Sequence, residues 1–430
     1  MIELKSVITC DLEGRIETFN AGAVQVFGYQ PEEVIGRKRV SFFSPGLTVL
    51  NHVSGWLKTA REQGEYRGRT VFLRRDGTSF AADVRITPTF RKGVQIGYCG
   101  VTVPRPDVPV SEAAQKISLT TRIFAWMVIT RAPFLSATVV PILAGAAWVV
   151  ASRRVEAFPW ALFWLALVGG VAMHIAANTF NDYFDWKSGA DPANNDYFMP
   201  YSGGSRSIEL RLVSERGLLR VAWISLAIAC LAGLPFLLLR GPLLLLFGAF
   251  GAFSVYFYTA PPLRLAARRG LGELIVGLNF GPLMTAGVVF ALTGTISWLD
   301  FFVGLPIGLL TTAILWINQF PDMTSDAQSG KINLVVMLGK ERARWGYLVL
   351  ILTAYALVIA GVLLNLLPVA VLIALATVPL AVYAVGIVFR HYSERNLIKA
   401  NSSTILVHLF YGLLLAAGLF LSAGAPRFFG

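Results

Sequence analysis

From Ala132 onward, nine stretches of the sequence contain no charged side chain, and each of them is 17 to 24 residues long. A helix needs about 20 apolar residues to cross the hydrocarbon core of a bilayer. The chain of 430 residues is 14% charged, whereas soluble domains carry about 25% charged residues. An integral membrane protein is therefore predicted, with spans at 132–151, 159–180, 221–239, 242–260, 274–293, 301–317, 347–364, 366–389 and 404–422.

The basic residues outside these stretches predict how the chain crosses the membrane. The N-terminus lacks the basic-then-apolar pattern of a secretory signal, so the first residues are expected to stay in the cytosol. Nine spans then place the C-terminus outside. From Arg122 onward, the cytosolic segments would hold seventeen Lys and Arg residues, and the external segments only four, Arg153, Arg154, Arg240 and Arg427. This bias supports the orientation and predicts a multi-pass protein of the cell (inner) membrane.

The residues that precede the spans have the pattern of a small mixed α/β domain, predicted to occupy residues 1–103. Asp76-Gly77 separates two apolar segments, as in a hairpin, and Phe80, Ala82, Val84 and Ile86 alternate as in a half-buried strand. A polar segment rich in proline, 104–118, is predicted to be a linker. The membrane domain is then expected to occupy residues 119–430.

The N-terminal domain resembles the PAS sensory domains. The resemblance lies in the order and spacing of five short segments, at residues 11–16, 20–23, 27–36, 75–78 and 97–101. It implies a module that senses a small molecule or a partner, and it leaves that PAS ligand unknown.

Two groups of carboxylates follow predicted spans, and each group combines an asparagine with aspartates at helical spacing. Their side chains share one helix face; the residues are Asn178, Asp182 and Asp185 in the first group, and Asn318, Asp322 and Asp326 in the second. The predicted topology places both groups on the cytosolic side. Because like charges repel, two such groups need a cation between them, and hard oxygen ligands favour Mg²⁺.

Three cytosolic loops add basic side chains to these acids, at Arg206, Arg264 and Lys331. Carboxylates that hold a cation, together with Arg and Lys that meet anionic oxygens, predict a site for a metal-bound diphosphate. The space between apolar spans suits a long hydrocarbon tail. The alternative is that the acids are solvated helix ends, which the duplication on one face of the membrane disfavours.

The same residues resemble the UbiA superfamily of intramembrane prenyltransferases, across about residues 120–425. Besides the two acidic groups, the resemblance rests on residues 203–206, 258–264, 272–273, 330–331 and 335–339. It implies an all-α membrane domain of nine transmembrane helices around a central cavity, capped by cytosolic loops. The spacing of Asp182 and Asp185, with Gly189 and Asp191, is most similar to the branch that prenylates 1,4-dihydroxy-2-naphthoate in menaquinone synthesis.

The resemblance implies Mg²⁺-dependent transfer of a polyprenyl group from polyprenyl diphosphate to an aromatic acceptor, within the lipid bilayer and with no nucleic-acid partner. Mg²⁺ would be held by four aspartates, which with two basic residues form the catalytic set: Asp182, Asp185, Asp322, Asp326, Arg264 and Lys331. The residues expected to bind substrate are Asn178, Asn318, Arg206, Tyr258, Asp191 and Arg131. For Arg131, which would bind the acceptor carboxylate, the alternative is an arginine that only sets topology.

Two departures from the pattern leave the acceptor open. Pro321 lies within the second acidic group and is expected to bend or end its span, since proline lacks the amide hydrogen. The spacing from Tyr258 to Arg264 is longer than in some branches. Other acceptors are 4-hydroxybenzoate, homogentisate, chlorophyllide or a glycerol phosphate lipid, and a non-catalytic membrane sensor is the rival function. A transporter is disfavoured because the spans contain no charged group near the midplane.

Overall fold

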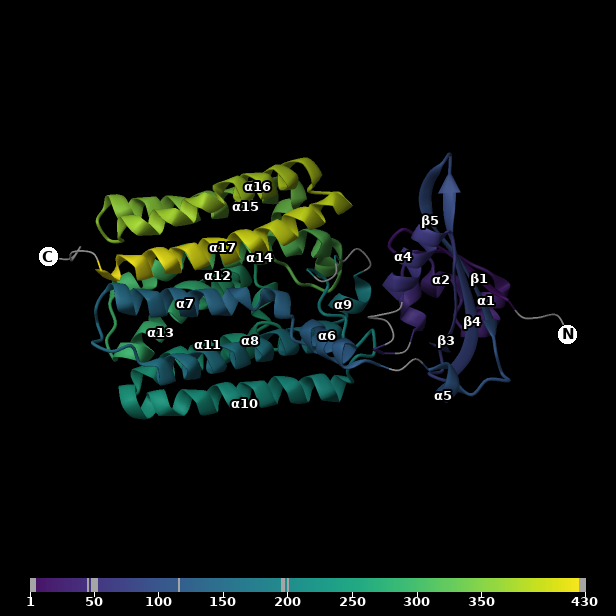
Figure 1. Cartoon of the computed structure of the whole chain (residues 1–430), viewed down its shortest axis with the longest axis horizontal. Coiled ribbons are helices and arrows are strands. Elements are labelled where there is room, and N and C mark those ends of the chain that lie inside the picture. The colour runs from purple at the N-terminus through teal and green to yellow at the C-terminus, as the bar shows by residue number, and fades with distance from the viewer. Residues whose placement is uncertain are drawn as a thin grey trace. The chain divides into compact units, whose positions relative to one another are not determined.

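The computed structural model describes residues 5–44, 46–47, 53–114, 117–194, 198 and 201–424 (Figure 1). The chain forms two compact units. The first comprises Met1–Ile129 together with Arg206–Ser214, and the second comprises Thr130–Ser205 together with Glu215–Gly430. The polypeptide therefore passes between the units three times, after residues 129, 205 and 214.

The first unit contains a five-stranded antiparallel sheet with strand order β2-β1-β5-β4-β3. The hairpin expected at Asp76-Gly77 joins β3 to β4, and Gly77 adopts the positive φ of 86° that this turn requires. The elements are β1 (Ser6–Asp11), β2 (Ile16–Phe19), α1 (Ala21–Phe27), α2 (Pro31–Val34), η1 (Val40–Phe43), α4 (Val53–Gln63), β3 (Tyr66–Leu73), β4 (Ser79–Arg91) and β5 (Val94–Pro104).

Aromatic side chains from the helices and the sheet fill the core of this unit. The ring of Phe27 stacks on Phe43 with the centroids 4.3 Å apart, and it meets the edges of Phe72 and Phe80 at 5.7 Å. Such aromatic contacts stabilise a core beyond the burial of their area. The small α/β domain predicted from the sequence is confirmed by this sheet and its covering helices.

Part of the segment that follows β5 is folded against the sheet. The helical turn α5 (Val110–Ala113) places Ala113 in a small apolar cluster with Val71 and Ala81. The next helix is α6 (Leu119–Ile129). Residues 115 and 116 lie outside the described part of the chain.

The second unit is helical, and every predicted span coincides with a helix or with consecutive helical segments. These are η2 (Ala132–Phe134), α7 (Ser136–Ala151), α8 (Trp160–Ser188), α9 (Ala190–Ala193), α10 (Glu215–Arg240), α11 (Leu243–Phe257), η3 (Leu265–Ala267), α12 (Leu271–Leu278), η4 (Asn279–Leu283), α13 (Met284–Thr293), α14 (Trp298–Gln328), α15 (Leu334–Leu363), η5 (Val369–Thr377), α16 (Val378–His391), η6 (Arg395–Leu397), α17 (Ile398–Leu421) and η7 (Ser422–Gly424).

Among the described residues, eight of these helical stretches are long and apolar enough to cross a membrane. The ninth predicted span is the shorter apolar helix α11, of 15 residues. The prediction of a multi-pass helical membrane domain is confirmed, with eight full-length spans and one shorter helix where nine spans were expected.

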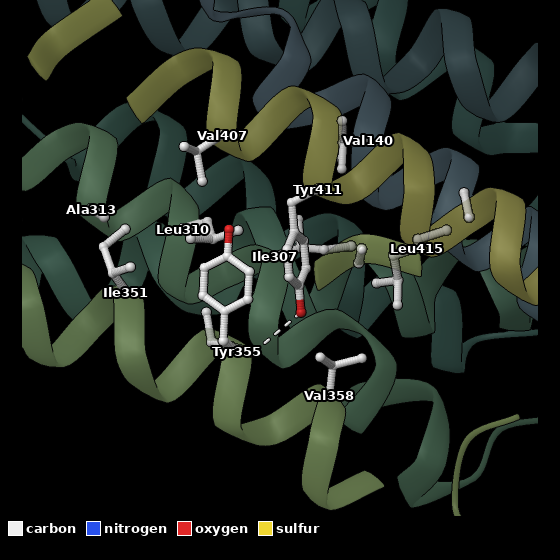
Figure 2. Packing of buried hydrophobic residues seen from close by; sticks show 14 of the residues in the cluster. Val140, Ile307, Leu310, Ala313, Ile351, Tyr355, Val358, Val407, Tyr411 and Leu415 are labelled. Atoms are coloured by element: carbon white, nitrogen blue, oxygen red, sulfur yellow. Dashed lines mark hydrogen bonds between the residues drawn. The ribbon is translucent and has the colours of Figure 1, made fainter. Parts of the chain in front are cut away.

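Helix α14 is the most buried of the eight spans, with apolar side chains packed on several sides. In Figure 2, Ile307 and Leu310 of α14 lie beside Tyr355 of α15 and Tyr411 of α17. The two tyrosine rings are perpendicular, with their centroids 5.3 Å apart, and the Tyr411 hydroxyl donates a hydrogen bond of 3.2 Å to the carbonyl of Ala354. The polar tip of this buried tyrosine is therefore satisfied within the core.

The sequence predicted that Pro321 would bend or end its span; helix α14 does not end there and continues to Gln328. A proline in a helix leaves the carbonyl four residues earlier without its amide donor. Here that carbonyl belongs to Ile317, and the side-chain amide of Asn401 on α17 donates to it at 3.3 Å. This bond replaces the missing one and helps the helix carry the second acidic group beyond the proline.

Helix α14 also approaches η4 so closely that only glycine fits. A Cβ atom on Gly281 would lie 2.5 Å from the Cα of Gly308. Neither atom can give way without a movement of backbone, so this contact fixes how α12, η4 and α13 pack against α14.

We therefore expect Gly281→Ala to destabilise the protein by about 1–3 kcal/mol, the usual cost of overpacking a core. Gly386→Ala on α16 is the matched control, because a Cβ there meets nothing within 4 Å. Alanine generally favours a helix over glycine, so the control should be neutral or stabilising. Thermal unfolding of both variants in one detergent measures the difference, and a midpoint for Gly281→Ala at or above that of the control would contradict the packing argument.

Candidate active site

A cavity of about 690 Å³ lies among the helices of the second unit. Apolar side chains of α10, α11 and α13 form much of its wall, among them Leu237, Phe247 and Val288. Nine of the twelve site residues predicted from the sequence also line it: Arg131, Asn178, Asp185, Asp191, Tyr258, Asn318, Asp322, Asp326 and Lys331. The structure thus brings residues that are up to 200 positions apart in sequence to one cavity.

The first acidic group lies in the last turns of α8, before Gly189 ends the helix in a left-handed conformation. Asp182 is buried, with 3% of its surface exposed. Its carboxylate pairs with the guanidinium of Arg131 at 2.8 Å and accepts a hydrogen bond of 3.2 Å from the amide of Ser205. Asp185 pairs instead with the ammonium of Lys331 at 3.0 Å.

The second acidic group lies in the last turns of α14. Asp322 accepts hydrogen bonds from the side-chain amide of Asn194, at 2.6 Å, and from the backbone amide of Gly203, at 3.0 Å. Asp326 accepts one from the side chain of Asn333 at 2.8 Å. Every carboxylate of the two groups therefore has a donor or a cation beside it, as buried charges require.

Lys331 connects the two acidic groups. Its ammonium lies 3.0 Å from Asp185 of the first group and 3.7 Å from Asp326 of the second. Burial alone would lower the pKa of this lysine, but these two carboxylates and Tyr258 raise it well above the ordinary value. The site therefore presents a charged lysine at neutral pH.

A turn of two glycines ties both acidic groups to one loop. Gly203 and Gly204 adopt positive φ angles of 73° and 72°, and a Cβ on Gly204 would lie 2.3 Å from the carboxylate of Asp191. This backbone directs the amide of Gly203 to Asp322 and the amide of Ser205 to Asp182. The sequence resemblance included these residues but did not indicate that their backbone amides would donate hydrogen bonds to the aspartates.

Further polar side chains hold the site without having been predicted to do so. Glu273 is buried and accepts from the side chain of Gln319, at 3.2 Å, and from the amide of Leu334, at 2.9 Å. Asn333 caps the start of α15, and its position before an apolar helix was the one signal available. Asn194 follows a four-residue helix in a loop, and no periodic pattern marks it.

The remaining predicted residues lie elsewhere. Arg206 belongs to the first unit, where its guanidinium donates to Glu209 at 2.8 Å. Arg264 donates a long hydrogen bond of 3.4 Å to the carbonyl of Ser329. Neither residue, nor Asp182, is among those that line the cavity. Their contacts with substrate therefore stay predictions. The side-chain amide of Asn178 donates a hydrogen bond to the carbonyl of His174. The side-chain oxygen of Asn318 accepts one from the side-chain amide of Asn401.

In the described part of the chain, no three His, Cys, Asp or Glu side chains are grouped closely enough to hold a metal ion. The aspartates predicted as metal ligands are instead compensated by Arg131, Lys331 and amide donors. Four carboxylates nevertheless supply the hard oxygen donors that Mg²⁺ prefers. The donor set fits this ion chemically, although the ligands are not gathered into a preformed cluster.

Comparison with known proteins gives a family for each part of the chain. The model of the UbiA prenyltransferase family matches residues 138–410, and a PAS domain model matches residues 4–103. The 1,4-dihydroxy-2-naphthoate octaprenyltransferase of Mycobacterium tuberculosis (strain ATCC 25618 / H37Rv) is 32% identical over 302 residues, which cover 68% of this chain and 96% of that relative.

Two solved structures show the same fold of the membrane domain. The apo structure of a UbiA homolog from Aeropyrum pernix K1 is 17% identical, with a TM-score of 0.51, and covers 66% of this chain and 97% of that one. The structure of a UbiA homolog from Archaeoglobus fulgidus bound to DMAPP and Mg²⁺ is 15% identical, with a TM-score of 0.50. It covers 70% of this chain and 100% of that one. The chain belongs to the UbiA prenyltransferase family and carries an N-terminal PAS domain.

Proposed function

We propose that this protein transfers a polyprenyl group from polyprenyl diphosphate to an aromatic acceptor, and that the acceptor is 1,4-dihydroxy-2-naphthoate in menaquinone synthesis. One observation carries the proposal. Lys331 joins two groups of aspartates at a cavity whose other walls are largely apolar. Such a cavity suits a substrate with a charged head and a long hydrocarbon tail. The relative from Mycobacterium tuberculosis supports the choice of acceptor.

The residues of this chain would divide the work of binding the diphosphate. Lys331 and Arg131 offer cationic donors to its oxygens in a site shielded from water, where such contacts are stronger than at an exposed surface. The apolar wall formed by α10, α11 and α13 would hold the tail. This arrangement places the allylic carbon near the boundary between the charged and the apolar parts of the cavity.

The reaction breaks the bond between the allylic carbon and the diphosphate oxygen, and the electron pair leaves with the diphosphate. A carbon of the electron-rich acceptor ring then forms the new carbon–carbon bond. That ring carbon releases a proton, or carbon dioxide where it carries the carboxylate. Lys331 and Arg131 stabilise the negative charge that builds on the leaving group. The apolar wall excludes water, which would otherwise capture the allylic cation.

We include Mg²⁺ in the proposal, held by Asp182, Asp185, Asp322 and Asp326. When bound, the ion would neutralise the diphosphate and make it a better leaving group. Two facts support this assignment: the hard oxygen donors of the two acidic groups, and the homolog from Archaeoglobus fulgidus bound to DMAPP and Mg²⁺. Arg206 and Arg264 are retained as proposed diphosphate contacts, and Asn178, Asn318, Asp191 and Tyr258 as proposed substrate contacts.

The orientation in the membrane is also part of the proposal. The excess of basic residues in segments on the same side as the acidic groups supports an active site and a PAS domain in the cytosol. The polar substrate head and the cation would then come from the cytosol, and the tail from the bilayer.

We expect Asp182→Asn and Asp322→Asn each to lower prenyl transfer by at least ~100-fold, the scale of losing a transition-state contact with developing charge. Glu341→Gln is the matched control, because this carboxylate is 74% exposed. Diphosphate release from a polyprenyl diphosphate is measured at saturating Mg²⁺ with and without 1,4-dihydroxy-2-naphthoate. Turnover near that of the control in either variant would refute the metal assignment, and release that no acceptor stimulates would refute the transferase.

We expect the end of α8 to face the cytosol and the loop between α7 and α8 to face the other side. In a background with Cys10, Cys99 and Cys230 replaced, the exposed positions Glu156→Cys and Lys187→Cys are labelled in intact cells with a reagent that cannot cross the membrane. Glu156→Cys should react and Lys187→Cys should react only after lysis. The opposite pattern would reverse the topology and place the acidic groups away from cytosolic substrates.

A further inference from the structure

We propose that the PAS domain controls the diphosphate site by holding residues 206–214, a segment that continues directly from the two-glycine turn at that site. The inference rests on the proposed function for the reaction that is controlled. Residues 206–214 form the strap. They lie in the loop between two membrane helices, α8 and α10, yet they belong to the compact unit formed by the PAS domain.

An ion-pair cluster fastens the strap to the PAS domain. Glu209 of the strap lies between Lys38 of the PAS domain, at 2.9 Å, and Arg206 of the strap itself, at 2.8 Å. The Glu209 side chain is 13% exposed and that of Lys38 is 23% exposed. The Lys38 ammonium also lies 4.9 Å from the centre of the Phe42 ring, which fixes its direction.

Glu209 is charged at neutral pH. Burial opposes the charge of Glu209, but Arg206 and Lys38 together lower the pKa of this carboxyl below its ordinary value. Removing one partner of a pair that is mostly shielded from water leaves the other charge uncompensated, which costs more than losing a surface pair. The contact between Lys38 and Glu209 is therefore a specific attachment, in contrast to the exposed pair of Lys58 and Glu62 on α4.

A second contact is made by the backbone. Gly46 of the PAS domain has a φ of 46°, and a Cβ there would lie 3.1 Å from the carbonyl oxygen of Arg211. The strap is itself folded by backbone hydrogen bonds, from Leu210 to Arg206 and from Leu212 to Ser207, both of 2.8 Å. It is thus a compact turn held at two places.

The strap is joined to the active site by a very short tether. Ser205, whose amide binds Asp182, is the residue directly before Arg206. Four residue steps separate Ser205 from Glu209, a distance of at most about 14 Å even in a fully extended chain. Arg206 has a positive φ of 56°, so the chain here is bent. A displacement of the strap must therefore be absorbed by the turn whose amides bind Asp182 and Asp322.

This connection gives the PAS domain a physical route to the chemistry. A ligand or partner that shifts the position of Lys38 would weaken or strengthen its ion pair with Glu209 of the strap. The amides of Gly203 and Ser205 beside the diphosphate site would then move as well. Couplings between sites are typically worth a factor of 5–150 in a binding equilibrium. The domain would therefore adjust the affinity for the diphosphate substrate rather than supply any catalytic group.

The test uses the full-length protein in lipid and a double-mutant cycle of Lys38→Met, Glu209→Gln and the double variant, with Lys58→Met as the control. Hydrogen exchange is followed at the amides of residues 201–214, and the KM for polyprenyl diphosphate is measured in parallel. We expect each single variant to raise exchange at Gly203 and Ser205 and to raise KM by about fivefold or more. The double variant should resemble the single ones, because both remove the same pair.

Two results would overturn the inference. Unchanged exchange at Gly203 and Ser205 in Lys38→Met would show that the PAS domain does not hold the turn, and additive effects in the double variant would show that Lys38 and Glu209 act separately. If the wild type forms no prenylated product, the proposed function fails, while the exchange measurement still decides whether the strap is coupled to the turn. Lys58→Met should leave both measurements at the wild-type values.

Discussion

The structure depends on the compensation of carboxylates that are held together away from water. An ionised carboxylate in such a place is costly unless a cation or a donor lies beside it. Lys331 performs this role for one aspartate of each acidic group, and Arg131 performs it for Asp182. The ends of α8 and α14, the loop after each of them, and the start of the first span are therefore bound into one arrangement by charge.

The same arrangement supports the proposal that the site binds an anion although it is rich in acids. Arg131 and Lys331 already lie among the carboxylates, so under the proposed function a diphosphate would meet cationic donors that are in place before it binds. Preorganised charge of this kind requires little rearrangement when the substrate binds. The surrounding glycine contacts, such as that between Gly281 and Gly308, keep the helices in the positions that the charges require.

Much of this could be predicted from the sequence, because apolar runs and helical spacing are properties of local sequence. The acidic groups, Lys331 and the two domains follow from such patterns. The roles of Asn194 and of the amides of Gly203 and Ser205 do not, because a loop has no period and a backbone amide carries no residue-specific signal. Pro321 shows a related limit: the sequence predicted a bend or an end of the span, and the helix continues past it with a hydrogen bond from Asn401, which lies 80 positions away and joins α14 only in the folded chain.

Asn401 has a consequence for how the protein is made. Its amide serves both the carbonyl of Ile317 and the side chain of Asn318, so α17 completes the part of α14 that leads into the second acidic group. A ribosome synthesises the chain from the N-terminus, so α17 emerges well after α14. The hydrogen bond that Asn401 donates beside Pro321 can therefore form only after about 80 further residues have been synthesised. Until then, the helix that bears Asp322 and Asp326 lacks this contact.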